Sequence, residues 1–219
     1  MEPKYLIDNG DLIVSYLARL GVEYVFGVPG GSIEPFYDAL ARSERRGGPK
    51  AILARHESGA AFMADGYSRV TGRVGVAEGP SGGGATYILP GLIEASESSY
   101  AVLGITTDIS VGSYGKYPLT EVDQDTLMQP LTKWNTVIKQ AQHIPRMMRT
   151  AFRAMTTGRS GAAHLGLPYD IQYDQVDPTD IWADPKHQSY PAYPQSPEPG
   201  AAEAAVDAIL SAKNPLIVC

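Results

Sequence analysis

The sequence predicts an α/β fold, in which a doubly wound parallel sheet carries helices on both of its faces. Short apolar runs alternate with segments of helical periodicity along most of the chain, as in proteins built from βαβ units. The runs contain few polar residues, which is typical of parallel strands covered on both faces. Six runs are expected to be strands: residues 24–28, 51–54, 74–78, 101–106, 136–139 and 162–167.

The segments between these runs have helical patterns. Residues 11–20 repeat apolar side chains at helical spacing, and residues 33–41 follow a glycine turn, with Ser32 as the expected N-cap. Alanines recur along residues 58–70, so this helix is expected to lie close to the sheet. Two further helices are expected, at residues 84–94 and 145–156.

The pattern changes after residue 170. Six prolines lie within residues 171–199, which we interpret as an extended linker on the surface. A helix is expected at residues 201–212 and an apolar strand at residues 215–219, as at the start of a second α/β domain. That strand would leave an unpaired apolar edge, so more chain or another subunit is expected to cover it. The expected organisation is a first domain at residues 1–170, a linker at 171–199 and the beginning of a second domain at 200–219.

Composition and charge exclude several classes of protein. The chain has 219 residues, a net charge of −6 and 43% apolar residues, which favours a globular fold and argues against nucleic-acid binding. No apolar run reaches the roughly 18 residues of a membrane span, so no membrane partner is expected. Cys219 is the only cysteine, which excludes disulfides within one chain and fits a cytoplasmic location.

Three segments follow expected strands at the edge where open α/β sheets bind ligands. Two are glycine-rich turns, residues 27–32 and 79–86, and each has a simpler interpretation as a plain connection from strand to helix. Neither fits a P-loop or a dinucleotide fingerprint, because the P-loop lysine and the required glycine spacing are missing. The third segment, residues 55–61, places Glu57 at a helix N-terminus, where the helix dipole favours a carboxylate in any protein.

Other catalytic patterns are not present in the sequence. The four histidines are scattered, and none has a second ligand at a zinc-type interval, so no metal residues are predicted. A hydrolase triad is unsupported, because the chain has no Gly-x-Ser-x-Gly elbow and its one cysteine stands outside any such motif.

Five segments, in this order and spacing, resemble the pyrimidine-binding domain of thiamine-diphosphate enzymes. They are residues 21–31, 55–72, 81–86, 130–135 and 157–161. The resemblance extends from about Leu6 to Pro168, and it is closest to the acetolactate synthase group with its related decarboxylases and carboligases. The linker and the helix and strand that follow it resemble the entry to that group's middle domain.

This resemblance implies a 2-keto acid decarboxylase or carboligase in which Glu57 activates the cofactor. A carboxyl group at this position protonates N1′ of the aminopyrimidine, so that the 4′-amino group can remove the proton from C2 of the thiazolium. The role needs a carboxyl with a raised pKa, which burial supplies against the opposing helix dipole. The resemblance further implies that the cofactor contacts Val28, Pro29, Gly30, Gly31, Pro80, Ser81, Gly82 and Thr86, although Thr86 also fits a purely structural role at a helix start.

Several positions depart from the acetolactate synthase pattern. In the second glycine-rich turn, Pro80 replaces a threonine, Gly83 a proline and Tyr87 an asparagine. Asp108 stands where a substrate-side glutamine is typical, and its charge would disfavour an anionic substrate unless it is paired or protonated. The expected substrate pocket, which the resemblance assigns to Asp108, Leu119 and Glu121, also has leucine at 119 in place of a phenylalanine.

In this superfamily another domain holds the diphosphate and Mg²⁺, through a Gly-Asp-Gly motif followed by an Asn-Asn pair. The sequence lacks this pattern. The resemblance therefore implies that thiamine diphosphate and Mg²⁺ bind only together with a second chain or domain, in a homo- or hetero-oligomer such as a dimer or tetramer. A small 2-keto acid is the implied substrate. The chain is then either one subunit of a split enzyme or the N-terminal part of a longer polypeptide.

One alternative keeps the fold and loses the chemistry. In it, the chain is a non-catalytic scaffold or regulatory subunit, and the changes at Pro80, Tyr87 and Asp108 favour this hypothesis. Retention of Glu57 together with both glycine turns argues against it.

Overall fold

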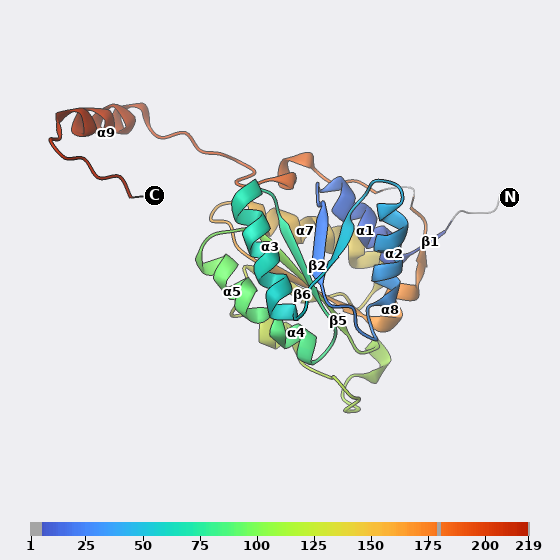
Figure 1. Cartoon of the computed structure of the whole chain (residues 1–219). Coiled ribbons are helices and arrows are strands. Elements are labelled where there is room, and N and C mark those ends of the chain that lie inside the picture. The colour runs from blue at the N-terminus through green and yellow to red at the C-terminus, as the bar shows by residue number, and fades with distance from the viewer. Residues whose placement is uncertain (1–5, 179–180, 219) are drawn as a thin grey trace.

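The computed structural model describes residues 6–178 and 181–218, and it has the predicted doubly wound α/β fold. Six strands form one parallel sheet in the order β3-β2-β4-β5-β7-β6. Helices cover both faces of this sheet (Figure 1). The chain winds outward from β2 to β3 on one side and from β4 to β5 on the other, so the winding reverses between β2 and β4.

All six expected strands are present, with ends that differ from the predictions by no more than two residues. The largest shift is in β6, which begins two residues early because Trp134 pairs with Ala163 of β7. Pairing with the neighbouring strand, and not apolar character, therefore decides where this strand lies. The strands are β2 (Tyr24–Gly27), β3 (Lys50–Leu53), β4 (Gly75–Gly79), β5 (Val102–Asp108), β6 (Trp134–Val137) and β7 (Ala163–Pro168), and a separate antiparallel pair consists of β1 (Ile7–Asp8) and β8 (Gln175–Val176).

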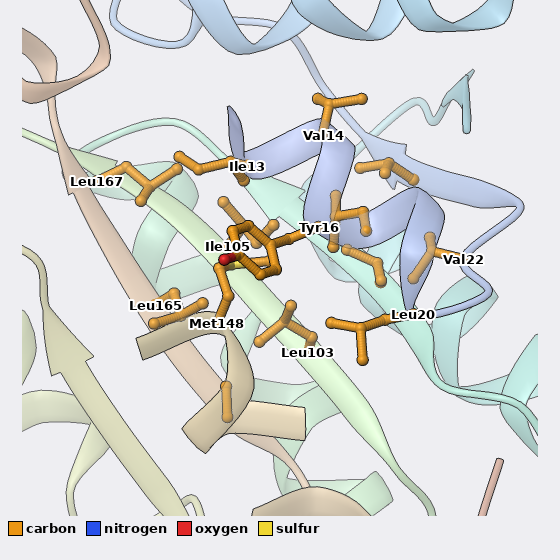
Figure 2. Close-up of a cluster of buried hydrophobic side chains, with 14 of the residues drawn as sticks. Ile13, Val14, Tyr16, Leu20, Val22, Leu103, Ile105, Met148, Leu165 and Leu167 are labelled. Atoms are coloured by element: carbon orange, nitrogen blue, oxygen red, sulfur yellow. The ribbon is translucent and has the colours of Figure 1, made fainter. Parts of the chain in front are cut away.

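The larger apolar cluster lies on the face covered by α1 (Asn9–Arg19), α2 (Glu34–Glu44) and α7 (Ile144–Thr156). Tyr16 of α1 is fully buried, and Figure 2 shows its ring reaching toward Ile105 of β5. Full burial of such a ring stabilises the fold by roughly 1.5–3 kcal/mol. This cluster fixes α1 and α2 against the sheet.

The opposite face is covered by α3 (Glu57–Thr71), α4 (Gly83–Tyr87), α5 (Leu89–Glu97) and α6 (Gln124–Met128). α3 lies close to the sheet, as its alanines predict: a Cβ added at Gly75 of β4 would overlap the Ala64 carbonyl oxygen. Its alanines also allow close packing on α5, because Ala61 is fully buried and a Cβ added at Gly91 would lie 2.5 Å from the Ala61 Cβ. Short side chains thus bring α3 and α5 into direct contact. Short elements complete the chain: η1 (Val111–Ser113), η2 (Ala141–His143), α8 (Tyr169–Tyr173) and η3 (Pro185–Gln188).

The single helix expected at residues 84–94 is wrong, because the structure has two helices here. α4 ends at Tyr87 and α5 starts at Leu89. Pro90 has no amide hydrogen to donate to the carbonyl of Thr86, so one continuous helix cannot pass this point. The break leaves α4 as a short separate turn at the end of β4.

The part of the chain after residue 170 also differs from expectation. The expected linker begins inside α8, and it includes β8 and η3. The expected terminal strand is not formed: residues 215–218 have no strand partner, and Cys219 lies outside the described residues. α9 (Pro199–Ser211) has no buried residue and extends away from the sheet in Figure 1. The division into two domains therefore stays a prediction.

The sheet brings the carboxyl ends of its parallel strands to a single edge. The turn after β2 and the turn after β4 flank the point between these strands where the winding reverses. Open α/β sheets bind their ligands at such a point. Within the described ranges, no helix is both long and apolar enough to cross a membrane.

Candidate active site

Glu57 lies at the first position of α3, as the sequence predicts. The preceding residue, His56, is the N-cap, and its Nδ1 accepts a hydrogen bond from the Ser58 amide at 3.1 Å. Ser58 Oγ donates to the Tyr87 carbonyl at 2.7 Å, and the rings of His56 and Tyr87 are 4.8 Å apart. These contacts fix the start of α3 against the end of α4. Tyr87 therefore has a structural role at the point where it replaces the family's asparagine.

The carboxyl group of Glu57 lies next to the second glycine turn. A Cβ added at Gly84 would be 3.3 Å from Glu57 Oε1, so glycine is needed here for the close approach. The residue is half-buried, and no hydrogen bond to its carboxyl group is formed within the described part of the chain. A partly shielded carboxyl group without a hydrogen-bond partner, on a helix start that is fixed by its neighbours, is available to a ligand.

Pro80 joins the two glycine turns. A Cβ added at Gly30 would lie 2.6 Å from the Pro80 Cβ, and one added at Gly84 would lie 2.6 Å from the Pro80 Cγ. The ring of Pro80 therefore fills the space between the two turns. A β-branched threonine with a hydroxyl group, as in the family pattern, would fill this space differently. This close packing requires glycine at positions 30 and 84.

Hydroxyl groups link the same turns to β5. Ser32 Oγ lies 2.6 Å from Thr107 Oγ1, and the Ser81 amide donates to Thr107 Oγ1 at 2.9 Å. Ser81 Oγ also lies 2.9 Å from Thr120 Oγ1. The prediction of Ser32 as an N-cap is wrong, because Ile33 caps α2 and the Ser32 hydroxyl is used in this network.

A cavity of about 280 Å³ lies beside this network and brings several predicted residues together. Its lining includes Gly31, Ser81 and Asp108, together with Ser32 and Thr120. The lining is thus rich in hydroxyl groups. The sequence assigned Asp108 to a substrate pocket and Gly31 and Ser81 to the cofactor, and the fold places all three at one cavity.

Asp108 is buried but fully paired. Its Oδ2 accepts a hydrogen bond from the Tyr114 hydroxyl at 2.7 Å, and its Oδ1 accepts one from the Ile109 amide at 2.8 Å. Burial raises the pKa of Asp108, while these two hydrogen bonds lower it. Both oxygens of Asp108 thus have neutral hydrogen-bond donors, and its role in a substrate pocket stays a prediction.

The remaining predicted residues lie around this centre in different ways. Leu119 is 91% exposed, and the lining of the cavity includes its neighbours Pro118 and Thr120 but not Leu119 itself. Glu121 Oε1 accepts a hydrogen bond from the Gly115 amide at 2.7 Å, which fixes the loop that follows β5. The Thr86 hydroxyl donates to the Gly83 carbonyl at 2.7 Å inside α4.

The sites of the other predicted cofactor contacts are the turns themselves. Gly82 has a φ of 70°, and an added Cβ there would lie 2.8 Å from the Thr120 Cβ. Val28 and Pro29 follow β2 directly and lead into Gly30. None of these roles is tested by the contacts, and they stay predictions.

Sequence reasoning missed Glu78 and its partner Tyr37. Glu78 is fully buried in β4, and its Oε2 accepts a hydrogen bond from the Tyr37 hydroxyl at 2.7 Å. The pKa of Glu78 is raised to about 8, because burial and the nearby charge of Glu57 outweigh the lowering by the Tyr37 hydroxyl and the Val28 amide. The available signal was a carboxylate within an otherwise apolar strand, directly before the second glycine turn.

The residues present fit only one end of thiamine diphosphate. The pyrimidine end needs a positioned carboxyl group beside small turns, which Glu57, Gly30 and Gly84 provide. Mg²⁺ at the diphosphate needs several oxygen ligands. Within residues 6–178 and 181–218, no group of three or more histidine, cysteine or acidic residues is arranged to hold a metal ion.

Comparison with known proteins agrees with this geometry. The family described as "Thiamine pyrophosphate enzyme, N-terminal TPP binding domain" matches residues 7–127. The chain is 39% identical to a probable acetolactate synthase large subunit from Methanocaldococcus jannaschii over 169 residues, which are 77% of this chain and 28% of the relative. It is 34% identical to a glyoxylate carboligase from Escherichia coli O157:H7 over 210 residues, 95% of this chain and 34% of the relative.

A third relative is matched along nearly the whole chain. An acetolactate synthase from Bacillus subtilis is 32% identical over 219 residues, which are 99% of this chain and 37% of the relative. The chain thus spans about a third of the length of the curated relatives it matches.

Proposed function

The chain belongs to the thiamine pyrophosphate enzymes whose N-terminal TPP binding domain it contains, and we propose that it supplies the pyrimidine-binding half of a carboligase active site. In this proposal Glu57 is the carboxyl group that activates the cofactor. The observation that carries it is the position of Glu57 at the start of α3, half-buried against the second glycine turn and without a hydrogen-bond partner in the described residues. When bound, thiamine diphosphate would supply a carbon nucleophile that adds to a 2-keto acid and accepts the electrons left when CO₂ departs.

Glu57 would hold and move a proton at N1′ of the aminopyrimidine. The helix start fixes its backbone, and the contacts of His56 and Ser58 with Tyr87 fix the helix start. Because the backbone of Glu57 is fixed, its carboxyl group acts from a defined position, and preorganised groups of this kind lower a barrier. Glu57 is thus a catalytic residue in this proposal.

The two turns would shape the site around this carboxyl group. Gly30 and Gly84 both pack against Pro80. The Pro80 ring occupies the space that a side chain at either position would need. We propose that Val28, Pro29, Gly30 and Gly31 border the reacting end of the cofactor, and that Pro80, Ser81 and Gly82 lie against the pyrimidine and exclude water. Thr86 would contribute indirectly, because its hydroxyl group stabilises α4 by donating to the Gly83 carbonyl.

The substrate would enter from the cavity beside Asp108. A small 2-keto acid is an anion, and an unpaired carboxylate would repel it. Burial raises the pKa of Asp108, which is the direction that reduces this repulsion, while Tyr114 and the Ile109 amide fix the position of its two oxygens. We propose that Asp108 and the loop with Leu119 and Glu121 distinguish this substrate pocket from that of acetolactate synthases.

The diphosphate and Mg²⁺ would be held by a partner, either a second chain or another domain. Two observations support this: the chain spans about a third of the relatives' length, and its described residues contain no group of three or more potential metal ligands. The proposed active site is therefore shared, as in a homo- or hetero-oligomer.

A binding measurement tests this half-site. We expect calorimetric titration with thiamine diphosphate and Mg²⁺ to show affinity at least about 100-fold higher when the diphosphate-binding partner is present, because two or more charge-assisted hydrogen bonds are then added. Tight binding by the chain alone would contradict the half-site. Absence of binding even with the partner would support the alternative of a non-catalytic scaffold or regulatory subunit.

A further inference from the structure

Glu78 is a buried carboxyl group that the proposed mechanism does not use. It lies one residue before the end of β4, where Gly27 of β2 and Ile105 of β5 flank it in the sheet. Its side chain lies on the face of α2, because the Tyr37 hydroxyl donates to its Oε2 at 2.7 Å. Its Oε1 is buried and has no hydrogen-bond partner in the described residues. A carboxylate in this position would have one oxygen without compensation, so the protonated form is favoured.

The surrounding backbone makes room for this pair. A Cβ added at Gly27 would overlap Glu78 Oε2 and would lie 2.5 Å from the Tyr37 hydroxyl. Position 27 therefore needs glycine, because any side chain there would occupy the space of the Tyr37–Glu78 pair. The next residue, Val28, lies in the first glycine turn, and its amide lowers the pKa of Glu78. The pair thus connects the interior of the sheet to the turn beside the cofactor site.

The groups that face Glu78 come from each neighbouring element. α2 contributes Tyr37, the start of α3 contributes the charge of Glu57, and the turn after β2 contributes the Val28 amide. The residue opposite on β5, Ile105, does not titrate. Glu57 is therefore the acidic group that acts on Glu78, and any charge on Glu78 acts equally on Glu57.

We propose that Glu78 is a positioning residue for Glu57. Glu78 stays uncharged in the working site, so that Glu57 exchanges its proton with the cofactor without a second negative charge nearby. This inference rests on the proposed function of Glu57. Ionisation of Glu78 would oppose a negative charge on Glu57 and so would oppose proton transfer to N1′. Ionisation of Glu78 at alkaline pH therefore slows activation of the cofactor by Glu57.

The first test uses the chain alone and does not depend on the cofactor. The pKa of Glu78 is about 8 in the folded chain and 4.5 in an unfolded reference, so the folded state binds this proton more tightly. The contribution of Glu78 to the free energy of unfolding is therefore largest below pH 4.5 and is lost as the pH rises to 8. Over this range the unfolding equilibrium constant rises by about 10³-fold because of Glu78. We expect Glu78→Gln to remove this part of the pH dependence, measured by urea unfolding at several pH values. Tyr37→Phe removes a hydrogen bond that lowers the pKa of Glu78, so we expect the loss of stability to extend to higher pH.

The second test measures hydrogen–deuterium exchange at C2 in the assembly with the diphosphate-binding partner. We expect exchange by the unchanged protein to fall at least about 10-fold above pH 8, exchange by Glu78→Gln to lack this alkaline fall, and Tyr37→Phe to move it upward. The same alkaline fall in Glu78→Gln would overturn the role of Glu78. Normal exchange by Glu57→Gln would instead overturn the proposed function, and it would leave the stability result unaffected.

A second, independent observation concerns a cavity away from Glu57. It has a volume of about 360 Å³ and lies between α7 and the segment of residues 182–193. Arg146, Arg149 and Arg153 line it from one face of α7, at a spacing of about one helical turn. Arg146 and Arg153 have no ion pair within the described residues. In a chain with a net charge of −6, this is a local concentration of positive charge.

The cavity also has aromatic walls. Trp182 and Tyr193 line it, and Arg149 lies 6.0 Å from the Trp182 ring. The buried residue His187 also lines the cavity, and its Nδ1 lies 2.7 Å from Thr156 Oγ1. Burial lowers the pKa of His187, so this residue adds no charge at neutral pH. Among the described lining residues Asp184 is the one carboxylate, and its Oδ1 accepts a hydrogen bond from the Lys186 amide at 3.0 Å.

We infer that this cavity binds a nucleoside triphosphate, with the phosphates on the arginines and the base against Trp182. Arginine forks match phosphate oxygens, and aromatic rings stack on bases. The volume lies within the range of small-molecule sites. Such a site would be separate from the proposed cofactor site, since no residue is shared with it.

Calorimetric titration of the full chain with ATP, and with tripolyphosphate as the anion without a base, tests this inference. We expect the double variant Arg146→Gln/Arg153→Gln to bind ATP at least about 100-fold more weakly. The matched variant Arg45→Gln/Arg46→Gln changes two exposed arginines after α2 and should bind normally. Equal affinity for tripolyphosphate and ATP would overturn the role of Trp182. ATP binding that the double variant does not weaken, or no binding of either probe, would overturn the site.

Discussion

Glu57→Gln is expected to reduce hydrogen–deuterium exchange at C2 of thiamine diphosphate by a factor of about 10² to 10⁴ in the assembly with its diphosphate-binding partner. Glutamine keeps the length and shape of the side chain, but it cannot give a proton to N1′ and take it back. The start of α3 and its contacts with Tyr87 involve His56 and Ser58, so they are unaffected. Exchange is measured by NMR after acid quench, as the loss of the C2 proton signal with time.

A matched control is available in the same chain. Glu34 also lies at the first position of a helix, α2, and it is exposed. We expect Glu34→Gln to exchange at the unchanged rate, because a helix-dipole effect at an exposed terminus is worth only about 0.3–1 kcal/mol of stability. Equal exchange rates for the Glu57 and Glu34 variants would show that Glu57 has no catalytic role, and the proposed function would then be wrong.

Gly75→Ala is expected to have the largest effect on stability among the glycine variants, with a loss of about 1–3 kcal/mol or more in the free energy of unfolding. An added Cβ would overlap the carbonyl oxygen of Ala64 in α3 and would lie 2.7 Å from its carbonyl carbon. Both neighbours are backbone atoms, so α3 itself must move away from β4. Because α3 begins with Glu57, the displacement should also weaken cofactor binding. Urea unfolding of the chain measures the stability change.

The contrasting variant is Gly66→Ala, within α3 itself. A Cβ there would have no neighbouring atom within 4 Å, and alanine favours a helix over glycine. We therefore expect Gly66→Ala to stabilise the chain by roughly 0.5–1 kcal/mol. If both variants changed stability equally, the close contact between α3 and β4 would not be the cause, and the account of Gly75 would be wrong.

Local patterns in the sequence predicted most of the fold. The apolar runs gave the six strands of the sheet, because a strand buried on both faces must be apolar along its length. The alanines of α3 predicted a helix close to the sheet, which the contact between the Ala64 backbone and Gly75 of β4 confirms. The failures have specific causes: Pro90 divides a helix that apolar spacing alone does not divide, and residues 215–218 have no neighbouring strand with which to pair. An apolar pattern predicts a strand, but hydrogen bonds to a neighbour are needed to form one.

The candidate site was predicted in part. The sequence alone placed Glu57 at a helix start and identified both glycine turns. It could not identify the hydroxyl network of Ser32, Ser81, Thr107 and Thr120, because these residues come from separate turns and strands. For the same reason it assigned the Ser32 hydroxyl to a helix cap, the nearest backbone partner along the chain.

The sequence by itself determined the fold class, the family and the position of Glu57, because these depend on periodicity and on motifs that are continuous along the chain. Only the tertiary structure decided that Asp108 is paired, that Pro80 joins the two glycine turns, and that Glu78 is buried beside Tyr37. The physical reason is that burial and hydrogen bonding depend on atoms that are distant in the sequence. Both quantities set the charge of a carboxyl group, so the electrostatics of this site became visible only when the sheet brought the carboxyl ends of β2, β4 and β5 together.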